Sequence, residues 1–294
     1  EDVTWCTFLH GLFELMAESS GDSFATHLLF GTSRVLSLLE RALEPARELS
    51  RPTKSLVDAF ATLESHRAIL YGDKTPGGGR SSGSWSRPRT LRNGKFALPR
   101  SLCSLEAANA PTLTLLFRLF DEIEAIDPAR RSSDPGLDAL ARAGLAIRDE
   151  LLHWQQREAA TSRSRPLATQ PSTRLAAVLM HALLLYHSMN FTFYYPCWST
   201  RTVPRLTQTE VDDHVAAILD LSGPLLADTD LPAVLLLFPV RMAGVHASAN
   251  HARDRVLGTI GKIRHKGFLV ADRIEVDLQE VWAYEGETLH DIEM

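Results

Sequence analysis

Residues 172–193 read STRLAAVLMHALLLYHSMNFTF, and their spacing indicates one helix that is apolar on most of its sides. Such a helix usually lies at the centre of its domain, because every face needs an apolar neighbour. Its longest apolar run, 175–186, is broken by His181 and is shorter than the roughly 20 residues that a membrane span needs. We therefore predict the core helix of an all-α protein and expect no membrane span.

Helical spacing of apolar residues continues on both sides of this stretch. Downstream, Thr207 and Glu210 form a capping-box pattern that should begin a helix. Pro239 lies inside another apolar segment, where we expect a kink. No alternating pattern typical of a strand is found, so we predict a single globular domain of about ten helices over 1–294. The expected helices cover 3–18, 23–44, 54–71, a stretch from 111, 136–158, 172–193, a stretch from 208, 233–250, 251–266 and 268–284.

Two polar segments interrupt the helical pattern. Residues 72–110 include a stretch rich in Gly, Ser, Pro and Arg that cannot bury much surface, so we predict one long mobile loop there. Arginines around Trp85 in this loop resemble a nucleic-acid contact, although a solvated loop explains them as well. Residues 159–170 contain Pro166 and are expected to form an internal linker.

The charge, the cysteine positions and the N-terminal sequence argue against several classes of function. The chain has 294 residues, a net charge of −5 and a pI near 6.1, so we expect no direct DNA contact by this chain. Cys6, Cys103 and Cys197 are far apart, which excludes a local zinc module and argues against a secreted disulfide framework. The N-terminus lacks the basic flank and apolar core of a signal peptide.

No catalytic signature is found. The sequence has no G-x-S-x-G elbow, no H-E-x-x-H helix, and no Walker or G-x-G-x-x-G loop. Acidic clusters at 121–124 and 212–213 lack a companion metal-binding helix, and acidic residues in a first turn also favour the helix dipole. We therefore predict no catalytic residue, no metal and no cofactor.

The most unusual stretch is YHSMNFTFYYPCW at 186–198. Polar groups among aromatic rings are typical of a small-molecule pocket. They are equally typical of a helix end packed in a core, because buried Tyr and Trp need hydrogen-bond partners. Both interpretations stay open. The candidate ligand-binding residues are His187, Asn190, Tyr194, Tyr195 and Trp198.

A basic run follows near the C-terminus. It could meet an acidic partner, or its later members could complement the dipole at a helix end and face the acidic side of the final helix. Its members are Arg253, Arg255, Lys262, Arg264, His265 and Lys266.

Four stretches together resemble one known family. They read HLLFGTSRVLSLLERA at 27–42, FATLESHRAILYGDKT at 60–75, LLLFPVRMAGVHA at 235–247 and RDRVLGTIGKIRHKGFLVADRIEVDLQEVW at 253–282. Their order and spacing are similar to the fungal-specific regulatory domain that follows the zinc binuclear cluster in fungal transcription factors. The Arg-rich loop after Tyr71 departs from that family, in which a shorter segment ends in a tryptophan; Trp85 is a candidate for its remnant.

The resemblance implies an all-α domain that regulates, self-associates or senses an effector. In that family the DNA contact is made by a zinc module built on six clustered cysteines, and this sequence has no such cluster. Either a zinc cluster precedes Glu1, or the chain is a stand-alone relative. The first hypothesis is a nuclear regulatory domain that controls pathway genes, such as those of secondary metabolism, through protein contacts and a candidate small effector. The alternative is a cytoplasmic enzyme or carrier for an apolar metabolite; we favour no enzyme but leave the question open.

Overall fold

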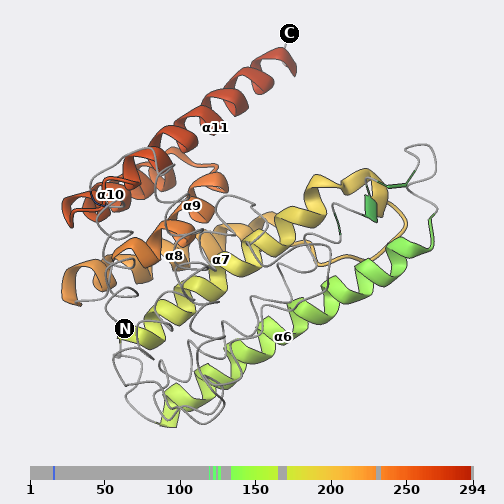
Figure 1. Ribbon diagram of the computed structural model, residues 1–294, viewed down its shortest axis with the longest axis horizontal. Coiled ribbons are helices and arrows are strands. Elements are labelled where there is room, and N and C mark those ends of the chain that lie inside the picture. Colours follow the sequence, from blue (N-terminus) through green and yellow to red (C-terminus); the bar gives the residue numbers. More distant parts are fainter. Residues whose placement is uncertain are drawn as a thin grey trace, which may run out of the picture. The chain divides into compact units, whose positions relative to one another are not determined.

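The computed structural model describes residues 16, 119, 122–123, 125–126, 134–164, 171–229 and 233–292, and these residues form helices and the turns between them, with no strand (Figure 1). This confirms the all-α prediction for the described part of the chain. The expected total of about ten helices and the 72–110 loop rest on residues outside that part. The elements are α6 (Gly136–Ser164), α7 (Pro171–Phe193), η4 (Tyr195–Trp198), α8 (Gln208–Asp228), η5 (Ala233–Leu236), α9 (Leu237–Val245), α10 (Asn250–His265) and α11 (Ala271–Ile292).

Contacts within the chain divide it into two compact units, each assembled from separate stretches. One unit contains Pro99–Thr229 and Met242–Ala252. The other contains Glu1–Leu98, Asp230–Arg241 and Arg253–Met294. The single domain over 1–294 stays a prediction, and each unit is described by itself below.

Helix α7 is the core of its unit, as its all-round apolar sequence predicts. It packs against α6 and α8, and the side chains from Ala182 to Ser188 are all buried. By length and composition Thr173–Phe193 could cross a membrane, but 78% of its most apolar window is buried inside the protein. Burial of that kind is what the central helix of a helical bundle requires.

Helix α6 is longer than the sequence suggested. We expected it to end at 158 and to be followed by a linker over 159–170, but it continues to Ser164. The added residues begin with two alanines, which are the best helix formers, and include no Gly or Pro. Pro166 then disfavours helical geometry at the residue before it, which accounts for the end of the helix near 164.

Helix α8 begins at the predicted capping box. The backbone N–H of Thr207 donates to Glu210 Oε2 at 2.7 Å, and the backbone N–H of Glu210 donates to Thr207 Oγ1 at 3.3 Å. Two backbone donors of the first turn are thereby satisfied, so the prediction is confirmed.

The segment around Pro239 differs from the expected kinked helix over 233–250. A short 3-10 turn, η5, leads into α9, and Pro239 is the third residue of α9. In a first turn proline needs no N–H partner, so it is accommodated there without a kink. Helix α9 then ends at Val245 rather than near 250.

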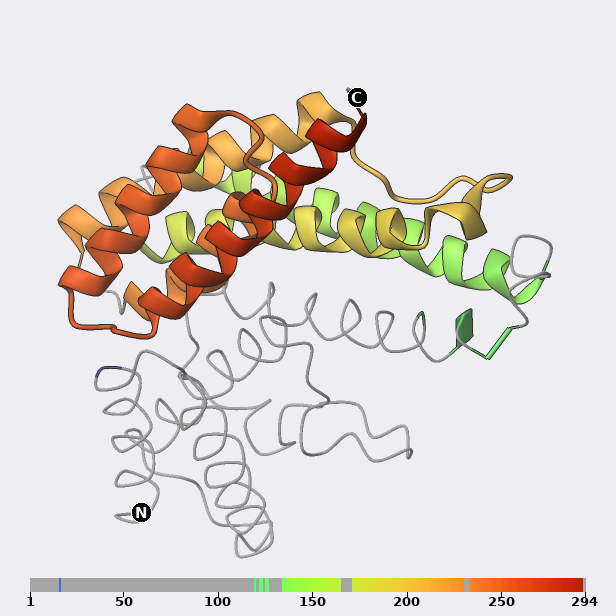
Figure 2. The same cartoon turned by 90° about the horizontal axis from the view of Figure 1, so that it is seen from above.

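Helices α10 and α11 follow one another around Gly267, whose φ of 98° is the left-handed geometry that favours glycine (Figure 2). Ile274 and Leu278 of α11 are buried, as its spacing predicts. Val281 was also expected on the buried face, but it is exposed.

Candidate functional site

The five predicted site residues lie at the C-terminal end of α7 and in the turn η4 that follows. His187 and Trp198 are each only 2% exposed, and Asn190 and Tyr194 are buried as well. The side chain of Tyr195 is outside the described part. The other four side chains therefore lie inside the protein, in a setting that agrees with the core-packing interpretation.

Three aromatic rings of this segment contact one another in a row, none of them face to face. The ring centroids of His187 and Phe191 are 5.4 Å apart in an edge-to-face arrangement, and those of Phe191 and Trp198 are also 5.4 Å apart. Tyr194 and Cys197 belong to the same buried cluster. Asn190 instead pairs with the hydroxyl of Tyr186, one turn earlier on α7, and burial raises the pKa of that phenol to about 12.

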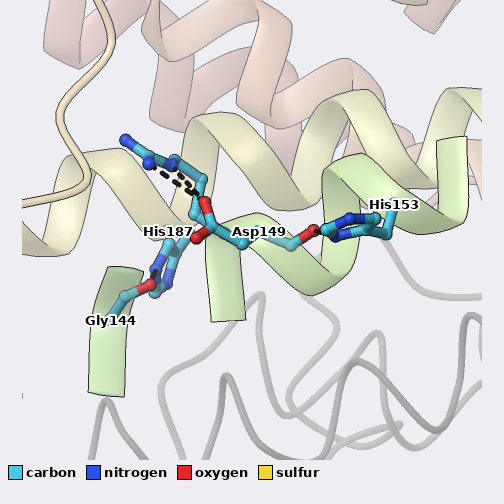
Figure 3. Close-up of polar contacts among 5 residues, drawn as sticks. Gly144, Asp149, His153 and His187 are labelled. Carbon is cyan, nitrogen blue, oxygen red and sulfur yellow. Dashed lines mark hydrogen bonds and ion pairs between the residues drawn. The ribbon is translucent and has the colours of Figure 1, made fainter. Parts of the chain in front are cut away.

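The His187 imidazole links α7 to α6 (Figure 3). Its Nε2–H donates to the backbone carbonyl of Gly144 at 2.9 Å. Burial lowers the pKa of His187 to about 4; the Gly144 carbonyl opposes this shift, and the charge of Arg148 adds to it. The ring is therefore neutral at pH 7, with Nε2 carrying the proton because the carbonyl can only accept.

Gly144 explains how α6 and α7 come this close. A Cβ built on Gly144 would lie under 3.0 Å from the ring of Phe191, which is fully buried. The glycine thus provides the space that Phe191 fills, and any larger residue there overpacks the core. The sequence gives no local signal for this pairing, because the two residues lie on different helices.

Arg201 holds the turn after α7 against the start of α6, and sequence reasoning missed it. Its Nε donates to Asp138 Oδ1 at 2.5 Å, its Nη2 to the Asp134 carbonyl at 2.7 Å and its Nη1 to the Cys197 carbonyl at 3.2 Å. The Arg201 side chain is only 11% exposed, so these are charge-assisted bonds in a partly dry setting. Asp134 in turn accepts a 2.7 Å bond from the N–H of Gly136 at the beginning of α6.

The indole of Trp198 is a buried polar group of η4. Its indole Nε1–H is buried and has no hydrogen-bond acceptor within the described part of the chain. Buried indole donors are usually satisfied by a protein atom, a water or a ligand. Nearby in sequence, Ser188 Oγ accepts a 2.9 Å bond from the Leu206 N–H and fixes the approach to α8.

A second histidine feature joins α7 to α8. His181 Nδ1 and His214 Nδ1 are 2.8 Å apart, so one ring donates and the other accepts a single proton. Burial is the largest cause that lowers the pKa of His181 to about 4, and His214 adds to it. Burial also lowers the pKa of His214, while Glu210 and Asp213 oppose this shift.

The acidic residues do not assemble a metal centre within the described ranges, where no group of three or more His, Cys, Asp or Glu side chains comes together. Asp212 instead accepts a 2.9 Å hydrogen bond from Gln208 in the first turns of α8. This position suits an acidic residue without a metal, because the helix N-terminus favours negative charge.

Comparisons with known proteins place the chain in a family. The family model for the fungal specific transcription factor domain matches residues 1–289, nearly the whole sequence. No curated protein and no solved structure matched the chain. The match agrees with the resemblance found in the four quoted stretches. The chain therefore belongs to the fungal-specific transcription factor domain family.

Proposed function

We propose that this chain is the regulatory domain of a nuclear fungal transcription factor and controls pathway genes, including those of secondary metabolism, through protein contacts or self-association. The observation that carries the proposal is the family match over 1–289. The site supports it as well, because the polar groups of His187 and Arg201 form hydrogen bonds that hold α7 and the turn after it against α6. Side chains used in this way stabilise a scaffold rather than perform chemistry.

A reporter experiment tests the regulatory role. The chain is fused to a heterologous DNA-binding module, and transcript from a reporter bearing the matching site is measured in a fungal host. We expect the fusion to change reporter transcript relative to the module alone. Equal transcript from the fusion and the module, with equal nuclear protein, would count against the proposal.

A small effector is a second candidate, favoured by one observation. The buried Trp198 Nε1–H has no partner in the described chain, so a ligand acceptor or a water would satisfy it. We propose that such an effector contacts the region of His187, Asn190, Tyr194, Tyr195 and Trp198.

Ligand binding there is measured by thermal shift and by tryptophan fluorescence against a panel of apolar metabolites. A binder raises the unfolding temperature by mass action, and His187→Ala should abolish the shift whereas His153→Ala, on the exposed side of α6, should keep it. If the chain chemically converts a metabolite of the panel, the stand-alone enzyme is favoured instead. If a metabolite binds but is not converted, and the reporter transcript does not change, a carrier is favoured. Equal shifts in both variants would remove this region as the site.

A further inference from the structure

One side of α10 is exposed along its length and basic. We call the set Arg255, Gly258, Gly261, Lys262, His265 and Lys266 the α10 face; the first five are exposed residues of α10, and Lys266 directly follows the helix. Their spacing of three and four residues places them on one side. The opposite side of the helix buries Val256, Thr259, Ile260 and Ile263.

Arg253 and Arg264 of the same basic run make contacts inside their own unit. Arg264 forms an ion pair with Asp272 at 3.1 Å, and the Arg253 guanidinium lies 5.1 Å from the centre of the Trp282 ring. The expectation that the run faces the acidic side of the final helix thus holds for Arg264. By contrast, the side chains of Lys262 and Lys266 are exposed and show no ion pair within the described part of the chain.

Two glycines lie in the middle of this basic surface. Within the described part of the chain, a Cβ added at Gly258 or Gly261 would meet nothing within 4 Å, so packing there does not require either glycine. An exposed glycine inside a helix makes that helix less stable than alanine would. The glycines leave the backbone of α10 open to close approach from outside, with cationic side chains beside the opening.

We propose that the α10 face docks an acidic helix of a partner protein. The inference rests on the proposed regulatory function and names the surface and the partner chemistry. Charge complementarity argues for it, because Arg255, Lys262 and Lys266 surround an open helix surface on which Asp254 is the exposed acidic residue. Gly258 and Gly261 lie one turn apart, which allows a crossing helix to reach the backbone.

The charge of the whole chain favours a protein over a nucleic acid. The net charge is −5, so a phosphate backbone that approaches α10 is repelled by the rest of the molecule. A short acidic helix carries fewer negative charges than an extended duplex, so the same long-range repulsion is weaker for it. Nucleic-acid binding is therefore the outcome that the experiment must exclude.

The test is fluorescence anisotropy with the full chain and a labelled synthetic helical peptide that carries glutamates on one face. A labelled DNA duplex of equal charge is the comparison probe. The double variant Lys262→Glu/Lys266→Glu should weaken peptide binding about tenfold, because two attractive pairs become repulsive. Added salt should weaken binding by the wild type as well.

The variant Gly258→Leu separates docking from general charge attraction, because it fills the opening without changing the charge. We expect it to weaken peptide binding several-fold, while its unfolding temperature stays at or above that of wild type. The matched control is Gly223→Leu in α8, where a Cβ also meets nothing within 4 Å, and its binding should equal that of wild type.

Three results would overturn the proposal: no binding of the peptide, tighter binding of the duplex than of the peptide, or equal affinity of Gly258→Leu and wild type. Failure here is distinguishable from failure of the regulatory function. If the reporter fusion changes transcript and the α10 variants act like wild type, only the docking surface is wrong. If the fusion leaves transcript unchanged, the regulatory function is wrong.

Discussion

Acidification from pH 7 to pH 5 tests the buried imidazole of His187. Burial, with a smaller contribution from Arg148, lowers the pKa of His187 to about 4 in the folded state, against an unperturbed value of 6.5. Because the folded pKa lies below the unfolded pKa, the unfolded chain binds a proton first as the pH falls. The contribution to stability is therefore complete above about pH 6.5 and is lost as the pH falls toward about 4.

The size of the loss follows from the pKa difference. One pKa unit corresponds to about 1.4 kcal/mol, and the unfolded state is largely protonated at pH 5 while the folded ring is still mostly neutral. His187 alone should then lower the free energy of unfolding by about 2 kcal/mol between pH 7 and pH 5. The pKa of His181 is also lowered to about 4, but the residue is partly exposed, so it contributes less to the loss of stability on acidification.

The assay is urea unfolding followed by far-UV circular dichroism at pH 7, 6 and 5. His187→Gln keeps a donor for the Gly144 carbonyl but does not titrate, so its stability should fall by about 2 kcal/mol less than that of wild type. The control is His153→Gln, which removes an exposed ring that contacts the Asp149 carbonyl on the same helix (Figure 3). Parallel pH profiles of wild type and His187→Gln would refute the reasoning.

Substitutions at three further positions probe the helix contacts and the cap of α8. Gly144→Ala should destabilise the fold by about 1–3 kcal/mol despite the better helix propensity of alanine, because its Cβ meets the buried Phe191 ring; urea unfolding measures this, and an unchanged midpoint would contradict it. Arg201→Ala should cost about 2 kcal/mol, because it removes the charge-assisted donors to Asp138 and to the partly buried carbonyls of Asp134 and Cys197. Arg201→Lys should recover only part of that loss in the same titration. Thr207→Ala should cost about 1 kcal/mol through loss of the cap of α8, and hydrogen exchange should show the first turn opening more often; exchange like that of wild type would remove the cap from the account.

Local patterns in the sequence were enough to predict helices α7 and α8 within the described part of the chain. The all-round apolar stretch of α7 predicts a buried central helix, and the Thr207 capping box predicts where α8 begins. Both depend on residues within a few positions of one another. Several expected boundaries were wrong, and two of them have local causes: two alanines continue α6 beyond 158 to Ser164, and Pro239 enters the first turn of α9 instead of bending a longer helix. Helix α11 was expected over 268–284 but covers Ala271–Ile292.

The site could be predicted only in part. The stretch 186–198 was singled out as unusual, and its assignment as a ligand site stays a prediction; its contacts could not be read from the sequence. His187 meets Gly144 across 43 positions, and Arg201 meets Asp134 across 67. Pairings of that kind depend on how three helices pack, so no spacing in one segment reveals them. His181 and His214 were overlooked for the same reason, since each looks like a solitary histidine on its own helix.

The central claim, that the chain regulates transcription, is tested most directly by RNA sequencing of a fungal strain in which the region coding for this chain has been deleted. We predict a coordinated change in the transcripts of a defined set of genes, which is restored by the wild-type chain returned at the same locus. Under the docking proposal, the Gly258→Leu chain, which leaves the fold intact, should restore it less completely. Transcript levels indistinguishable between the deletion strain and its parent, under every growth condition in which the chain is expressed, would contradict the account.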